Sequence, residues 1–296
     1  GHLRLFQRAA NWVLPKIDTP YSAEELEYFR THPDEVVSLR QQIFEQIDPY
    51  LTFQNPGQIE AREATGREAI AAVEDPEVRR ALTPTVPYGC QRPLVSNHYY
   101  PTFNRANVDL VTDPIERITA TGVRTVDGVE HPCDTIVYAT GFLTTQFLSA
   151  IAVTGRNGVS IADAWSDGAH AYLGITTAGF PNLFMLYGPN TNNGSILYMI
   201  EAQVEYAVRQ IRRMDAEDLA WIDVRPEVEA AYNDALQHDL ARIGPWAEGT
   251  CHNYYRSPSG RIVTQWPHSM SEYRRRTEAD DPAAFETAVV GVRDRA

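Results

Sequence analysis

Residues 135–142 constrain the fold more than any other stretch of the chain. Residues 135–138, Thr-Ile-Val-Tyr, form a β-branched and aromatic run, which is typical of a buried strand. Ala139, Thr140 and Gly141 follow at once, and small residues at the end of a strand let a ligand approach the backbone. Because ligands of doubly wound α/β sheets bind beyond the carboxyl ends of strands, the stretch predicts a nucleotide platform. A strand that ends in an ordinary turn is the alternative.

The composition is typical of a soluble globular protein, and its 296 residues allow two domains. The chain has 26 basic and 39 acidic residues, and its net charge of -13 argues against nucleic acid or an anionic membrane as the main partner. No apolar run reaches the roughly 18 residues of a membrane span, and the N-terminal residues lack the apolar core of a signal peptide.

The cysteines and histidines predict no metal site. Cys90, Cys133 and Cys251 are odd in number and lie far apart, so they predict neither a disulfide framework nor a zinc site. His98, His238, His252 and His268 show no HxxxH or HxxE spacing. A cytoplasmic protein is the default for this cysteine pattern.

A strand is predicted at residues 3–6, very close to the first residue of the chain. A strand in that position predicts that an N-terminal half is missing. Arg8 follows the strand, where a Rossmann fold places the residue that contacts the adenosine ribose. An arginine there suits the 2′-phosphate of NADP, and a solvated surface charge is the alternative.

Residues 22–80 are predicted to be mainly helical. Ser22 and Glu25 fit a capping box, Asp75 precedes a proline that begins a short helix, and apolar residues recur at helical spacing in between. This segment is interpreted as a helical insertion.

The loop at residues 83–111 is rich in proline, glycine and aromatic residues, and Arg92 lies among neutral neighbours, which is typical of a loop shaped for a ligand. A plain surface charge is the alternative for Arg92.

Strands are predicted at residues 108–111 and 115–119, followed by a hairpin that turns at Asp127 and Gly128. A second apolar strand is predicted at residues 182–187, and it ends in Gly188, Pro189 and Asn190. 

Two helices are predicted after this strand, at residues 195–214 and 226–240. The first begins at Gly194 and Ser195, where free N–H groups and the helix dipole favour an anion or an electron-rich carbonyl. Aromatic residues are dense after Gly244, including Tyr254 and Trp266, and their number suffices to wall an apolar pocket.

Five ordered blocks carry a family resemblance: FQRAANWVLP; GCQRP with YYPTFNRANV; DTIVYATGF; NLFMLYGPNT with SILYMIEAQVEY; and YRSPSGRIVTQWPHSMSEYRRRT. In this order they resemble the Baeyer-Villiger monooxygenases, and most closely the 4-hydroxyacetophenone monooxygenase branch. The resemblance covers almost the whole chain but only the C-terminal portion of the family. It implies an α/β fold with two Rossmann-like domains, for FAD and NADPH, here lacking the N-terminal half and carrying a helical insertion at about residues 22–82. Residues 1–140 would be the remainder of the NADPH domain, and residues 141–296 the FAD domain and the substrate-side tail.

The sequence departs from the family in several places. It contains no GxGxxG for FAD, no second glycine-rich loop and no FxGxxxHxxxW fingerprint. These would be absent, or supplied by another chain, with a homodimer as one arrangement. Gln91 replaces the lysine of many relatives, and residues 188–201 are about two residues shorter than in some of them.

The resemblance implies that NADPH reduces FAD, O2 adds at flavin C4a, and the peroxyflavin attacks an aryl or bulky ketone to give an ester or lactone. Arg92 would be catalytic, because a guanidinium stays charged beside an anionic oxygen. Arg8 and Gln91 would contact NADPH, and the other implied cofactor contacts are Ala139, Thr140, Gly141, Asn190, Gly194, Ser195 and Ile196. Tyr254 and Trp266 would line the ketone pocket. A related flavin N- or S-monooxygenase and a fragment inactive without its N-terminal half are the alternatives.

Overall fold

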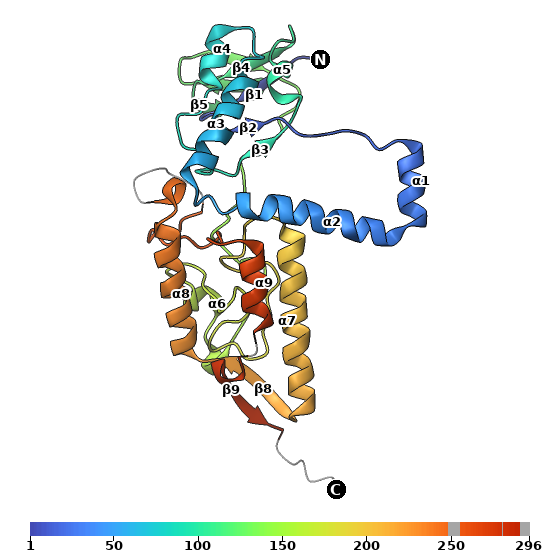
Figure 1. The fold of residues 1–296 in the computed structure, drawn as a ribbon. Coiled ribbons are helices and arrows are strands. Elements are labelled where there is room, and N and C mark those ends of the chain that lie inside the picture. The colour runs from blue at the N-terminus through green and yellow to red at the C-terminus, as the bar shows by residue number, and fades with distance from the viewer. Residues whose placement is uncertain (248–254, 280, 291–296) are drawn as a thin grey trace. The chain divides into compact units, whose positions relative to one another are not determined.

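The computed structural model describes residues 1–247, 255–279 and 281–290. The chain forms two compact units, which are described separately below: unit 1 is residues 1–22 and 55–142, and unit 2 is residues 23–54 and 143–296 (Figure 1). The predicted helical segment at residues 22–82 is therefore divided, since its first part belongs to unit 2. The predicted boundary at residue 140 lies next to the one observed after Phe142.

Unit 1 contains two pairs of parallel strands. β1 (Leu3–Phe6) pairs with β4 (Val108–Val111), and β2 (Val13–Leu14) pairs with β3 (Leu94–Val95). The register places Phe6 opposite Val111, so β1 and β4 end at the same edge. This confirms the strands predicted at residues 3–6 and 108–111.

The helices of unit 1 are α3 (Pro56–Ile70), α4 (Pro76–Ala81) and α5 (Tyr99–Thr102). As predicted, Asp75 begins α4: its carboxylate accepts hydrogen bonds from the backbone N–H groups of Glu77 and Val78. A Cβ on Gly66 of α3 would lie only 2.6 Å from the Trp12 ring, so glycine lets α3 pack directly on β2. The core of the unit contains Val13, Ile70, Val73, Leu82 and Tyr100.

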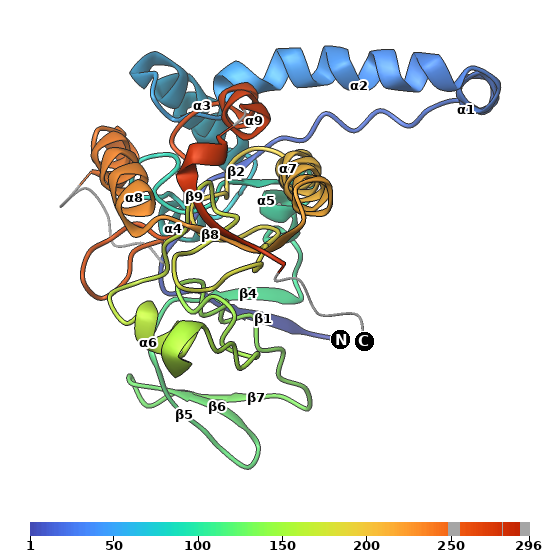
Figure 2. The same ribbon diagram turned by 90° about the horizontal axis from the view of Figure 1, so that it is seen from below.

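An antiparallel sheet completes unit 1, with β5 (Ile115–Ile118), β6 (Gly122–Thr125) and β7 (Glu130–Pro132) in that order (Figure 2). Gly128 has a φ of +87°, which the turn between β6 and β7 requires. The hairpin predicted at Asp127 and Gly128 is thus confirmed.

The strand predicted at residues 135–138 is wrong. None of these residues lies in a strand, and Val137 and Tyr138 are 83% and 71% exposed. β-propensity produces a strand only where another strand accepts the ladder, and within the described residues none pairs with this run. Its apolar side chains therefore remain at the surface, as does that of Phe142.

Unit 2 is mainly helical. Its longer helices are α1 (Ala23–Thr31), α2 (Pro33–Ile47), α7 (Ile196–Ala216), α8 (Pro226–Ala241) and α9 (Met270–Glu278). Its shorter elements are η1 (Asp48–Tyr50), η2 (Arg156–Gly158), α6 (Ile161–Ala164), η3 (Gly244–Trp246) and η4 (Pro282–Ala284). β8 (Leu219–Val224) and β9 (Phe285–Val289) form an antiparallel pair. The predicted starts of α1 after Ser22, α7 after Ser195 and α8 at Pro226 are confirmed.

The second predicted strand, residues 182–187, is also wrong. Asn182 and Tyr187 have φ values of +59° and +58°, which end an extended conformation at both sides. The segment is instead held by separate bonds: the Asn182 N–H donates to the Ile222 carbonyl, and the Met185 N–H donates to the Ile175 carbonyl.

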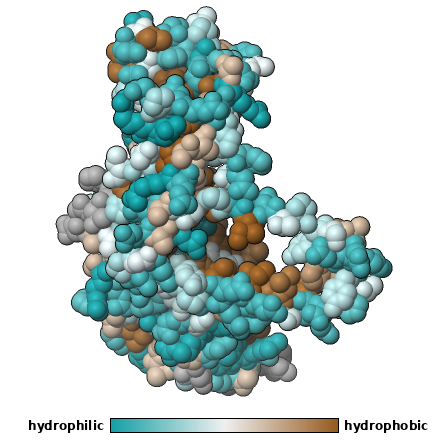
Figure 3. Space-filling view, turned by 45° about the horizontal axis from the view of Figure 1, so that its top comes forward, coloured by the Kyte–Doolittle hydropathy of each residue, from teal (hydrophilic) through white to brown (hydrophobic). Residues whose placement is uncertain are grey.

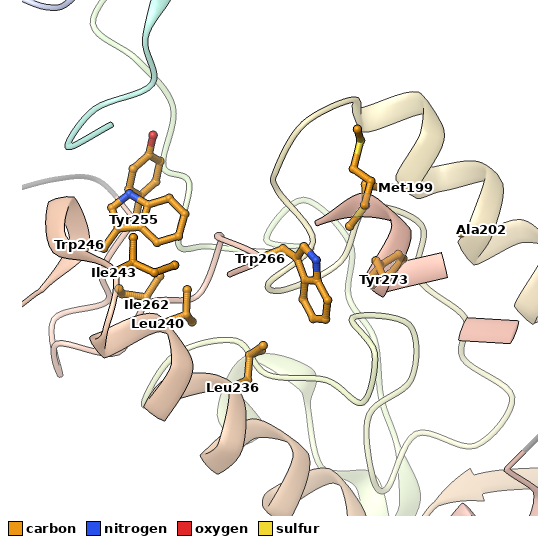
Figure 4. Packing of buried hydrophobic residues seen from close by; sticks show 11 residues of the cluster. Met199, Ala202, Leu236, Leu240, Ile243, Trp246, Tyr255, Ile262, Trp266 and Tyr273 are labelled. Atoms are coloured by element: carbon orange, nitrogen blue, oxygen red, sulfur yellow. The ribbon is translucent and has the colours of Figure 1, made fainter. Parts of the chain in front are cut away.

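The largest core of unit 2 lies between α7, α8 and α9. Figure 4 shows Trp266 between Met199 of α7 and Leu236 of α8, with Tyr273 beside Trp266. The other members of this core are Ala202, Leu240, Ile243, Trp246, Tyr255, Ile262 and Met270. The apolar side chains of α7 are only partly buried, because Val204, Val208 and Ile211 are 40%, 38% and 53% exposed.

Cys90 is buried and disulfide-bonded, which the spacing of the cysteines did not predict, whereas Cys133 is exposed and free. Among the helices that the structure describes, none has the length and hydrophobicity of a bilayer span.

Candidate functional site

Arg92 lies in a loop of unit 1 that is fixed by the residues around β2. The Trp12 indole donates to the Val86 carbonyl over 2.8 Å, and the Asn11 amide donates to the Arg92 carbonyl over 2.9 Å. The Arg92 side chain is exposed, and Gln91 is half-buried. The backbone of Arg92 is therefore held in place while its guanidinium is accessible.

Arg8 follows the edge at which β1 and β4 both end. The Gln7 N–H donates to the Val111 carbonyl over 3.0 Å, and the Tyr99 hydroxyl donates to the Gln7 side chain over 2.7 Å. Arg8 itself is exposed. An accessible arginine just beyond the carboxyl ends of two parallel strands fits the ribose end of NADP.

Ala139, Thr140 and Gly141 are exposed, although no strand precedes them. Gly141 has a φ of +92°, and a Cβ there would meet no atom within 4 Å. The glycine is thus needed for the backbone turn and not for close packing within the described residues.

In unit 2, the Asn190 side chain is buried and binds two backbone carbonyl groups. Its φ is +58°, and its amide donates to the carbonyls of Ile262 (2.8 Å) and Gln265 (2.9 Å). The neighbouring Asn193 donates to the Trp266 carbonyl over 3.1 Å. These bonds tie the segment before α7 to the segment before α9, and the Asn190 amide holds both in place.

The N-terminus of α7 is positioned by Met270 at the start of α9. The Ser195 N–H donates to the Met270 Sδ over 3.1 Å, and a Cβ on Gly194 would lie 2.6 Å from the same sulfur. The Ser195 hydroxyl accepts from the Tyr198 N–H and caps α7. Gly194, Ser195 and Ile196 are all half-buried, so this positive helix end is partly accessible.

Asp48 in turn holds the start of α9. Its buried carboxylate accepts from the Met270 N–H (2.6 Å), the Ser271 N–H (3.2 Å) and the Ser271 hydroxyl (2.6 Å). The sequence interpretation missed Asp48, because a contact between residues 222 positions apart leaves no local pattern. Ser269, which caps α9, could have been found from its capping-box spacing to Glu272.

We expect the Asp48→Ala substitution to lower the free energy of unfolding by about 1–3 kcal/mol, because it leaves two backbone N–H groups of α9 without their acceptor. Urea unfolding followed by circular dichroism measures the change. Asp48→Asn keeps an acceptor oxygen and should lose less. The exposed Asp18→Ala serves as the control, and a loss as large at Asp18 as at Asp48 would contradict this role for Asp48.

Trp266 is fully buried in the core of unit 2, where its indole donates to the Ser269 carbonyl over 3.0 Å and its ring meets that of Tyr273 edge-on at 5.2 Å. Burial raises the pKa of Tyr273 well above its usual value, so its phenol stays neutral. Tyr254 lies outside the described residues. Within the described residues no cluster of His, Cys, Asp or Glu could hold a metal ion.

Relatives cover nearly the whole chain. A Baeyer-Villiger monooxygenase of Pseudomonas aeruginosa is 36% identical over 96% of this chain and 55% of its own length, and one of Streptomyces coelicolor is 33% identical over 96% and 56%. An FAD-binding monooxygenase of Aspergillus niger is 37% identical over 93% and 47%. No family model matches the sequence. The chain spans about half the length of the curated relatives it matches.

Solved structures of Baeyer-Villiger monooxygenases are also similar to the chain. A closed crystal structure of cyclohexanone monooxygenase superposes with a TM-score of 0.82 at 26% identity, covering 98% of this chain and 63% of that one. The chain is homologous to part of a Baeyer-Villiger monooxygenase. OTEMO in complex with FAD and NADP, with a TM-score of 0.78 and 25% identity, covers 97% of this chain and 62% of its own. These flavin Baeyer-Villiger monooxygenases have Rossmann-type folds, which confirms the predicted fold class.

Proposed function

We propose that this chain forms part of an FAD- and NADPH-dependent Baeyer-Villiger monooxygenase, which inserts one oxygen atom of O2 next to a ketone carbonyl. The observation that carries the proposal is similarity to such enzymes along almost the whole chain, in sequence and in fold. The product would be an ester or lactone. The resemblance implies an aryl or bulky ketone, and Trp246, Tyr255, Trp266 and Tyr273 do not identify it, because they pack in the core of unit 2.

The residues of this chain have distinct proposed roles. When bound, FAD would activate O2, and NADPH would supply the electrons that reduce FAD. Arg92 would stabilise the negative charge that develops on the reacting oxygens, since a guanidinium does not lose its proton. Gln91 and the 139–141 turn would lie near the nicotinamide. The N-terminus of α7, at Gly194, Ser195 and Ile196, would face the flavin edge through its positive dipole.

The test is to supply the purified protein with FAD and NADPH and to measure NADPH oxidation with and without an aryl ketone. An ester that carries one 18O atom from 18O2 is the expected product. Absence of bound FAD under saturating conditions would support the inactive-fragment alternative. NADPH oxidation that yields only hydrogen peroxide with every ketone tested would also count against the proposal.

A second candidate function is N-oxygenation. A phenazine N-monooxygenase of Lysobacter antibioticus is 42% identical over 54% of this chain, a higher identity over a shorter stretch. Offering a ketone and a heteroaromatic amine separately distinguishes the two: an ester from the ketone supports the first, and an N-oxide alone supports the second.

Replacement of Arg8 by alanine should raise the Michaelis constant for NADPH by roughly 10- to 100-fold, the size expected from losing one or two charge-assisted hydrogen bonds to the 2′-phosphate. The constant for NADH should change little. Steady-state kinetics with both nucleotides measures this, with the exposed Arg117→Ala as the matched control. Equal effects on NADPH and NADH would remove Arg8 from 2′-phosphate recognition.

A further inference from the structure

Unit 2 contains a cavity of about 470 Å³, and of the proposed site residues only Ser195 belongs to its lining. Three helices form it: α2, the first turns of α7, and α9. The lining residues are Val37, Arg40, Gln41, Ile43, Phe44, Ile47, Ser195, Tyr198, Glu201, Glu205, Met270 and Arg274. A volume of this size is typical of small-molecule sites.

The walls of the cavity are largely apolar and aromatic. Phe44 of α2 stacks on Tyr198 of α7, with ring centroids 4.4 Å apart and planes at 22°. Ile43 and Ile47 of α2 are 46% and 40% exposed, so apolar surface remains open to a ligand. Figure 3 shows apolar side chains in brown along the arm that carries α2. Aromatic rings, aliphatic side chains and the Met270 thioether together suit a flat aromatic ligand.

The charged residues of the lining neutralise one another. Arg40 lies 2.5 Å from the Glu201 carboxylate, and Arg274 lies 2.6 Å from that of Glu205 and 2.9 Å from that of Glu278. The lining therefore holds two arginines and two glutamates, with no net charge. Burial raises the pKa of Tyr198, so its phenol is uncharged at neutral pH. A charged ligand would therefore meet no unbalanced charge of opposite sign in the lining.

We propose that this cavity is a binding site for a neutral, flat aromatic molecule. The ligand would lie against the Phe44 and Tyr198 rings, with Ile43 and Ile47 beside it. The inference goes beyond the proposed monooxygenase function, because binding here requires neither NADPH nor O2. Ser195 borders both the cavity and the proposed flavin contact, so FAD must be tested as a competitor.

The experiment measures binding of two fluorescent naphthalenes to the whole chain. One is the neutral 6-propionyl-2-(dimethylamino)naphthalene, and the other is the anionic 8-anilinonaphthalene-1-sulfonate. We expect saturable binding of one neutral probe per chain with a blue-shifted emission, and affinity for the anionic probe at least about tenfold lower. Equal affinity for both probes would overturn the proposal, and so would displacement of the neutral probe by FAD.

Substitutions of two lining residues test whether the neutral probe binds in this cavity. Phe44→Ala should weaken neutral-probe binding about tenfold through loss of the aromatic wall, and Ile47→Trp should do so by filling the space. Ile211→Ala and Ile211→Trp are the matched controls, because Ile211 is 53% exposed on α7 and does not line the cavity. Unchanged affinity in both Phe44→Ala and Ile47→Trp would place the probe elsewhere and overturn the proposal.

A third variant tests for a gain of anionic-probe binding, which counts only in protein that keeps the native near-UV circular dichroism, because partly unfolded protein also binds this probe. Glu201→Gln removes the carboxylate that neutralises Arg40 and should raise affinity for the anionic probe about tenfold, while neutral-probe binding stays within about twofold. Circular dichroism confirms the fold of each variant. No gain of anionic binding in folded Glu201→Gln would show that the arginine does not face the ligand and would overturn the proposal.

Discussion

Replacing Arg92 with alanine is expected to lower the rate of ester formation by about 10²–10³-fold in the FAD-loaded protein. The reason is electrostatic: a fixed positive charge favours the state in which negative charge has developed on oxygen, and alanine offers none. Reduction of FAD by NADPH should survive, because hydride transfer does not require charge stabilisation at that oxygen. Anaerobic bleaching of the flavin absorbance measures reduction, and chromatography of the ester measures oxygenation.

Two further variants separate a specific role of Arg92 from a general loss of charge. Arg92→Lys keeps the charge without the planar guanidinium and should recover only part of the rate. Arg105→Ala, in the same unit and also exposed, should leave oxygenation within about twofold. Ester formation near the unmodified rate in Arg92→Ala would exclude Arg92 from the reaction. Equal loss of reduction and oxygenation would indicate a defect in nucleotide binding instead.

Trp266→Ala is expected to lower the free energy of unfolding by about 3–5 kcal/mol. The side chain is fully buried beside Tyr273, so truncation leaves a cavity in the core of unit 2 and frees the Ser269 carbonyl from its hydrogen bond. Trp266→Phe fills most of the same volume and should cost clearly less. Denaturant unfolding monitored by far-UV circular dichroism measures both.

The same variant tests the sequence prediction that Trp266 lines the ketone pocket. Under that prediction, the Michaelis constant for the ketone would rise while stability changed little. Tyr138→Ala is the control for stability, since a side chain that is 71% exposed should alter it by less than about 0.5 kcal/mol. If Trp266→Ala stays stable and has a higher Michaelis constant for the ketone, Trp266 lines the ketone pocket and is not required for the stability of the core.

Features encoded by neighbouring residues could be predicted from the sequence. Ser195 and Asp75 begin helices because their side chains accept hydrogen bonds from N–H groups two or three residues ahead. Gly128 likewise completes a turn between adjacent strands. Each of these signals lies within a few residues of the helix or turn that it specifies.

Features that depend on distant residues could not be predicted. Residues 135–138 have strand propensity, but a strand also requires a pairing partner, which the run itself does not specify. Asp48 reaches α9 across most of the chain, and no local pattern marks that contact. The dense aromatic residues predicted that Trp266 packs against other apolar groups. They could not distinguish a hydrophobic core from a ligand pocket, because both bury the same kind of side chain.

No strand among the described residues pairs with the run at residues 135–142, and this has a consequence for the protein in solution. Its backbone N–H and C=O groups lie beside the exposed apolar side chains of Val137, Tyr138 and Phe142, with no proline to interrupt pairing. An exposed apolar segment of this kind is an aggregation hazard, because it can pair with the edge of a sheet or with the same segment of another molecule. Whatever covers this run therefore also governs how concentrated the protein can become before it aggregates.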